Sequence, residues 1–225
     1  MNRRDVSTCR ARGARNVVCG AASYVLLICG LTALAYAGFV VVDAHAFQRR
    51  ALAALEASRA GHLGVRLGAA PLPVADGGVV GEMEIARLGL DVVIVQGDSP
   101  GVLRRAVGHL PATPLPGEVG NVVLAGHRDT FFRALRLVQP GDTLTLKTSQ
   151  GDLYYEVESS AVVPPTALSV LQPSTDRTLT LITCFPFYYV GPAPNRFIVR
   201  ARQIGPLAVL AADKNIRQLS DQYVP

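Results

Sequence analysis

The chain has 225 residues, of which 49% are hydrophobic and only 17% are charged. This composition is typical of a globular domain that carries a membrane segment, and it excludes a disordered chain. The formal net charge is +5, and five arginines against one aspartate in the first 15 residues supply +4 of it. The remainder is nearly neutral and the whole chain has two lysines, so the clustered basic surface of a nucleic-acid-binding protein is excluded.

An uncharged apolar run extends from Val17 to Val42. About 20 apolar residues span a bilayer, so the run predicts one transmembrane helix at residues 17–42, preceded by a basic cytoplasmic arm at residues 1–16. The arginines before the run and Asp43 after it place the N-terminus in the cytoplasm and the rest of the chain outside. The alternative is a cleaved signal peptide, because Ala35-Tyr-Ala37 resembles a cleavage site. The length of the run favours an uncleaved anchor, and both alternatives export the same domain.

Residues 43–80 are predicted to connect the membrane helix to the exported domain. Residues 44–60 favour a helix, which would extend the membrane helix as a stem, whereas residues 61–80 collect Gly and Pro and are predicted to form a tether. A domain is predicted at residues 81–204, where short Val, Ile, Leu and Thr runs alternate with turn residues. Residues 205–225 remain as a C-terminal tail that alternates poorly.

Seven short runs in this domain have the pattern of strands. They are residues 82–88, 90–95, 121–125, 143–147, 153–158, 178–184 and 196–201. Two short helices are predicted at residues 100–106 and 131–137, the second capped by Asp129 or Thr130. The regular spacing of strands and turns predicts a mainly β fold with a closed or nearly closed β-barrel.

The exported domain contains one cysteine. Cys9 lies in the basic arm and Cys19 and Cys29 lie in the apolar run, which leaves Cys184 outside the membrane. A lone thiol in an oxidising exterior is unusual unless its reactivity is used, although a small buried hydrophobic role is the common alternative. Cys184 ends the run 178–184, so it is expected at the rim of the sheet, where a ligand can reach it.

A cysteine nucleophile needs a partner that favours the thiolate, and imidazole is the usual one. His45 and His62 fall in the stem and tether, and His109 falls in a turn-like segment where a structural role is expected. His127 follows an apolar strand and therefore also lies at a strand end. A lone His is more often structural than catalytic, but a distant Cys and His pair is typical of thiol enzymes. His127 is therefore the candidate partner of Cys184.

Acyl transfer also develops negative charge on a carbonyl oxygen, for which arginine supplies fixed donors. Arg196 opens the strand after Cys184, and an antiparallel hairpin would return it beside the cysteine. Arg200 and Arg202 lie further along the same face of this strand and are the alternatives, as exposed strand arginines. Arg128 and Arg133, near His127, are further candidates whose positions in the sequence favour this role less. No residues have metal-ligand spacing and no phosphate-binding loop is present, so neither a metal nor another cofactor is predicted. Asp129 is expected to cap a helix rather than to orient His127.

Two blocks of the sequence resemble the signature motifs of sortases. They are Leu124-Ala-Gly-His-Arg-Asp-Thr-Phe-Phe-Arg-Ala-Leu135 and Thr178-Leu-Thr-Leu-Ile-Thr-Cys-Phe-Pro-Phe-Tyr-Tyr-Val-Gly191, the second continuing to Ala201. The segments 81–90 and 106–117 also fit, so the resemblance covers about residues 81–203, and the short spacing is most similar to class D. The resemblance does not extend to the tail at residues 205–225.

The resemblance implies an eight-stranded β-barrel and a reaction in two acyl transfers. Cys184 would attack the peptide bond after Thr in an LPxTG-like sorting signal of an exported protein, His127 would protonate the departing amine, and Arg196 would bind the oxyanion. An amine from a peptidoglycan precursor or another protein would then resolve the thioester. The alternatives are a plain thiol hydrolase with the same residues and a membrane-tethered barrel that binds a partner without chemistry.

A thioester survives until aminolysis only if water is held away from it. The aromatic residues of the segment 185–189, which are Phe185, Phe187, Tyr188 and Tyr189, are candidates for this role. Ordinary hydrophobic cover for the end of the barrel is the alternative for the same side chains.

Overall fold

The computed structural model describes residues 3–61, 74–189 and 191–205, in two compact units, Met1–His45 and Ala46–Pro225. The described residues of the first unit all belong to helix α1 (Arg3–Gly61). In the part of α1 whose side chains are described, one stretch is long and apolar enough to cross a membrane, and its large hydrophobic side chains between Tyr24 and Val42 are exposed. This finding fits one membrane-spanning helix near the N-terminus, and the bounds 17–42 stay a prediction.

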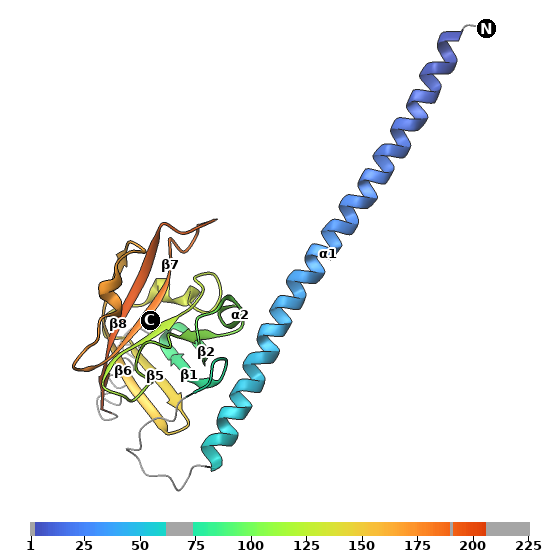
Figure 1. The fold of residues 1–225 in the computed structure, drawn as a ribbon. Helices are drawn as coiled ribbons and strands as arrows, with labels where there is room; N and C mark the ends of the chain where they lie inside the picture. Colours follow the sequence, from blue (N-terminus) through green and yellow to red (C-terminus); the bar gives the residue numbers. More distant parts are fainter. Residues whose placement is uncertain (1–2, 62–73, 190, 206–225) are drawn as a thin grey trace, which may run out of the picture. The chain divides into compact units, whose positions relative to one another are not determined.

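Eight strands of the second unit close into a barrel in the order β1-β2-β3-β4-β7-β8-β6-β5, which confirms the predicted eight-stranded fold. Figure 1 shows these strands as a ribbon. Neighbouring strands are antiparallel except for β2 with β3 and β4 with β7, which are parallel. The strands are β1 (Val79–Ile85), β2 (Leu90–Gln96), β3 (Val107–His109), β4 (Gly120–Ala125), β5 (Thr143–Thr148), β6 (Gly151–Val163), β7 (Arg177–Phe185) and β8 (Asn195–Ile204).

The barrel interior is filled by the inward side chains of every strand, because successive residues of a strand point to opposite faces. In β7, Leu179 and Leu181 are fully buried in this core, together with Tyr155 from β6. Phe132 and Leu135 join the same core from the segment that follows β4. That segment is therefore held to the barrel by two anchoring side chains rather than by strand pairing.

Several local features differ from the sequence-based predictions. The first predicted strand, 82–88, ends at Ile85, and Ala86–Leu88 form a 3-10 turn instead. The segment of His109 forms strand β3 instead of a turn. The sequence showed no strand pattern here, because the strand has only three residues and Gly108 is at its centre. Helix α2 is limited to Pro100–Leu103, and the second helix is a 3-10 turn at Arg133–Leu137. Its N-cap is Phe132 with no side-chain cap, so the predicted capping by Asp129 or Thr130 is wrong. Most of the predicted tether (62–73) and tail (206–225) lies outside the described residues.

The C-terminal part of α1, from Ala46 onward, belongs to the same unit as the barrel. Ala51 and Leu55 are 5% exposed, and Ala51 packs with Val93 and other apolar residues of β2. The Gln48 amide accepts a hydrogen bond from Val93 N (2.8 Å) and donates one to Arg105 O (2.5 Å). Pairing of β2 with β3 starts only at Ile94, so Gln48 satisfies backbone groups just before that ladder begins.

A charged cluster lies on β1, β2 and β5. Lys147 Nζ is 2.8 Å from carboxylate oxygens of both Glu82 and Glu84. The Asp91 carboxyl shares this surface, and desolvation, followed by its hydrogen bond to Glu82, raises the pKa of Asp91 to about 6. Ionising Asp91 beside two carboxylates therefore works against the folded state.

We expect Asp91→Asn to remove a pH-dependent loss of stability. The pKa of Asp91 is raised above the value of about 4 in an unfolded chain, so its favourable contribution is complete below that value and is lost as the pH rises through about 6. Chemical unfolding of the detergent-solubilised chain should show that wild type loses stability between about pH 4 and pH 6 relative to the variant, with little further change above pH 6. Parallel pH profiles for the two proteins would contradict this assignment.

Candidate active site

Cys184, His127 and Arg196 all line one groove of about 420 Å³. The groove lies where β4, β7 and β8 reach the same edge of the barrel, with Ile182 and Ile198 among its lining side chains. One wall comes from the last residue of β6 and the segment that follows it. It consists of Val163, Pro164, Pro165, Ala167, Leu168, Val170 and Leu171. The three residues that the sequence proposed separately are therefore brought to one largely apolar groove.

The strand register explains how Cys184 and Arg196 meet. β7 and β8 are antiparallel, and Cys184 is the direct cross-strand partner of Arg196. Cys184 is half-buried and is a free thiol, so it is sheltered without being inaccessible. Cross-strand partners in an antiparallel pair lie close together, which places the backbone of Arg196 beside that of Cys184.

His127 reaches the groove through the parallel pairing of β4 with β7. Ala125 is level with Ile182, Gly126 N donates to Ile182 O (3.1 Å), and Thr183 Oγ1 donates to Gly126 O (2.7 Å). Two hydrogen bonds therefore fix the residue before His127 against the two residues before Cys184.

Gly126 is required at this point because of a close approach rather than a special backbone angle. A Cβ at this position would lie 2.8 Å from the ring of the buried Phe132. A further hydrogen bond from Phe132 N to His127 O (3.0 Å) closes the turn. The His127 side chain is exposed and makes no hydrogen bond within the described part of the chain, so its ring is free to meet a substrate.

The Arg196 side chain bends over the connection between β7 and β8. Its Nη1 donates to Asn195 O (3.0 Å) and Ala193 O (3.3 Å), while Nε and Nη2 have no hydrogen-bond partner among the described residues. The two alternatives on the same face are occupied elsewhere. Arg202 pairs with Glu158 at 2.9 Å, and Arg200 lines a separate hollow of about 170 Å³.

His109 has the structural role that its sequence context indicated. It is 1% exposed, and its ring nitrogens lie 2.8 Å from Gln96 Oε1 and 2.8 Å from Pro114 O. Burial lowers the pKa of His109, which favours the neutral ring. This histidine ties β3 to β2 and to the following loop, and it does not line the groove.

The aromatic residues after Cys184 cover the end of the barrel. Phe185, Phe187 and Phe197 form one ring cluster, with centroids 5.3 to 6.3 Å apart, and Phe187 and Phe197 also pack on the core. Tyr188 and Tyr189 are exposed, and none of these side chains lines the groove. The apolar side chains around Cys184 therefore come from Ile182, Ile198 and the segment after β6. The sequence indicated them only weakly, through strand alternation and the Pro164-Pro165 pair.

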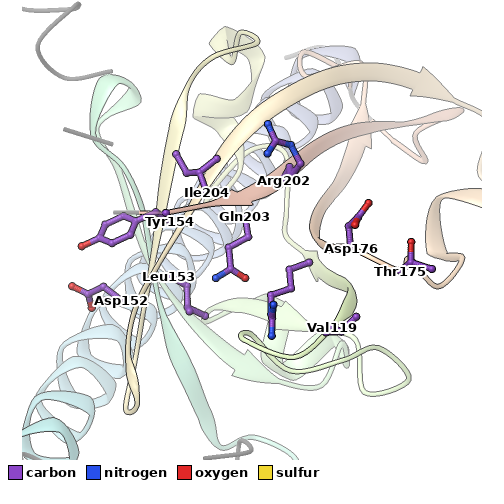
Figure 2. A pocket seen from close by; sticks show the side chains of 11 residues that line it. Val119, Asp152, Leu153, Tyr154, Thr175, Asp176, Arg202, Gln203 and Ile204 are labelled. Atoms are coloured by element: carbon purple, nitrogen blue, oxygen red, sulfur yellow. The ribbon is translucent and has the colours of Figure 1, made fainter. Parts of the chain in front are cut away.

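Figure 2 shows a second cavity, of about 500 Å³, which lies at the ends of β6, β7 and β8 away from the groove. It is lined by the starts of β6 and β7 and the end of β8, including Leu153, Arg177 and Gln203. No cysteine or histidine lines it, so the candidate Cys and His pair belongs to the smaller groove alone. Within the described ranges, no group of three side chains is arranged to hold a metal ion.

Comparisons with known proteins agree with this geometry. The model of the sortase domain family matches residues 83–204. Sortase D of Bacillus subtilis (strain 168) is 36% identical over 125 residues, a match that covers 55% of this chain and 63% of the relative, less than two thirds of its length.

Solved structures extend the comparison to the fold. A Clostridium perfringens sortase D5 transpeptidase superimposes with a TM-score of 0.59 at 26% identity, covering 73% of this chain and 99% of that one. The SrtA sortase of Actinomyces oris gives a TM-score of 0.55 at 28% identity, covering 62% of this chain and 87% of that one.

Proposed function

The chain belongs to the sortase family, and from this premise we propose that it is a membrane-anchored cysteine transpeptidase acting outside the cytoplasm. The observation that carries the proposal is the meeting of Cys184, His127 and Arg196 in one groove at three neighbouring strand ends. The apolar helix near the N-terminus supports a single-pass anchor, with the arginine-rich N-terminus in the cytoplasm.

In the first step, the Cys184 thiolate attacks the carbonyl carbon of the Thr residue in an LPxTG-like sorting signal on an exported protein. The C–N bond after Thr breaks, a thioester forms, and His127 gives a proton to the departing amine. An extended peptide can lie in the open groove, with the apolar wall after β6 receiving its apolar residues.

In the second step, an amine from a peptidoglycan precursor or another protein attacks the thioester. His127 takes the proton from this amine, the C–S bond breaks, and Cys184 is regenerated. The apolar side chains around Cys184 favour this outcome over hydrolysis, because they limit the access of water to the thioester.

Arg196 is proposed to hold the carbonyl oxygen while it carries negative charge. Its uncommitted Nε and Nη2 can donate there, while Nη1 remains bonded to the connection. We expect Arg196→Ala to lower kcat by about 10²-fold, the loss typical of one oxyanion donor. Arg200→Ala is the matched control on the same strand face and should keep nearly full activity in a steady-state peptide assay. An equal loss of kcat in both variants would contradict the proposed role of Arg196 as the oxyanion donor.

A peptide panel varied around LPxTG, followed by mass spectrometry, tests the function directly. The full chain in detergent is incubated with each peptide, with and without triglycine as the amine. A product that joins the peptide to triglycine is the expected result. Cleavage that yields only the free acid would identify a plain thiol hydrolase, and no cleavage of any peptide would favour a binding barrel.

A further inference from the structure

We infer that Arg128 is a positioning residue that ties the segment of His127 to the connection between β7 and β8. The inference rests on the proposed function, because it assigns a second residue to the same site. Arg128 directly follows His127 and is half-buried, but it does not line the groove. It therefore acts through other residues rather than on the substrate.

The guanidinium of Arg128 makes three contacts with the connection. Its Nη2 donates to Tyr189 O (2.6 Å) and Gly191 O (3.1 Å), and the group lies over the Tyr189 ring, 5.7 Å from the centroid. Two carbonyls and one ring face suit the planar fork of arginine and are not matched by the point charge of lysine. Arg136 adds a weaker contact at the surface, 5.6 Å from the ring centroid of the exposed Tyr188.

The connection that Arg128 holds links the two other candidate residues. It leaves β7 directly after Cys184 and Phe185, and it enters β8 at Asn195, one residue before Arg196. Its carbonyls at 193 and 195 accept hydrogen bonds from Arg196, just as those at 189 and 191 accept from Arg128. Releasing Arg128 would therefore disturb the direction of Arg196 and the placement of His127 relative to Cys184.

The environment of Arg128 fits a positioning role better than a purely stabilising one. Its Nη1 is buried without a hydrogen-bond partner among the described residues, and no ion pair of the described residues neutralises its charge. A buried N–H group without a partner costs free energy even in a half-buried arginine, so a neutral residue of similar size is expected to be tolerated by the fold. Activity and stability should therefore separate when Arg128 is replaced.

Kinetics of Arg128→Gln, Arg128→Lys and the control Arg133→Gln in the full chain test the inference. Arg133 is exposed in the same segment, and its side chain makes no polar contact among the described residues. We expect Arg128→Gln to lower kcat by about 10²-fold with little change in KM, because a displacement of about 1 Å costs this much. Arg128→Lys should show a smaller loss than Arg128→Gln, and Arg133→Gln should keep the wild-type kcat. All three variants should have melting temperatures close to that of wild type.

Hydrogen exchange supplies a readout that does not depend on the activity. The amides of Phe187, Tyr188, Tyr189 and Gly191 should exchange about tenfold faster in Arg128→Gln than in wild type, whereas Arg133→Gln should leave them unchanged. Unchanged exchange, a kcat within twofold of wild type, or a global loss of stability that accounts for the lost activity would each overturn the inference. If wild type itself joins no peptide, the proposed function fails, and faster exchange in Arg128→Gln still supports the tie.

Discussion

Replacing Cys184 with alanine is expected to abolish peptide joining, with a fall in kcat of at least about 10⁴-fold. The proposed reaction passes through a thioester on this sulfur, and alanine offers no atom that can form it. Cys184 is half-buried in the wall of the groove and is not part of the packed core, so its removal should leave the barrel folded. The measurement is the mass of the enzyme during turnover, which should gain the acyl group in wild type and not in Cys184→Ala.

The other cysteines provide the control for this experiment. Cys29 is an exposed free thiol in the apolar part of α1, so an acyl adduct must be localised by peptide mapping before it is assigned. Cys29→Ala should keep full activity and the same adduct at Cys184. Joined product from Cys184→Ala at the wild-type rate would mean that the barrel acts without this nucleophile.

Most of the barrel could be predicted from local patterns, because its strands carry strong β-formers and turns separate them. β7 shows this well: Leu179 and Leu181 alternate with polar residues, and both are buried in the core. β3 was missed because three residues containing Gly108 carry no periodicity, and β6 runs five residues beyond its predicted end at Glu158. Pairing with β8 holds the Ser159-Ser160 part of β6 in the sheet, which is a tertiary effect that local propensity does not contain.

The candidate site was predictable where residues stand at strand ends and unpredictable where loops complete it. Strand ends gave Cys184 and His127, and the hairpin argument gave the position of Arg196, which the register of β7 and β8 reproduces. The apolar wall at residues 163–171 comes from a segment without periodicity. The contact of Arg128 with Tyr189 joins residues 61 positions apart, so only the folded chain brings it into view.

Alanine substitutions of His127 and His109 are expected to have opposite effects on activity and stability. His127→Ala should lower kcat by about 10³-fold or more, because in the proposed reaction the same imidazole serves as acid in one step and as base in the other. Its ring is exposed and makes no hydrogen bond within the described residues, so the melting temperature should stay near that of wild type. His109→Ala is the matched opposite, since it leaves Gln96 and Pro114 O without their buried partner, and it is expected to cost about 1–3 kcal/mol of stability.

Thermal unfolding and single-turnover kinetics of both variants separate the two roles. At a temperature where each variant is folded, His109→Ala should keep most of the wild-type acylation rate, while His127→Ala should lose it. His109 lies outside the groove, on β3, and so has no path to the substrate except through the fold. Normal acylation by His127→Ala would show that His127 does not carry out the proton transfers and that another group does.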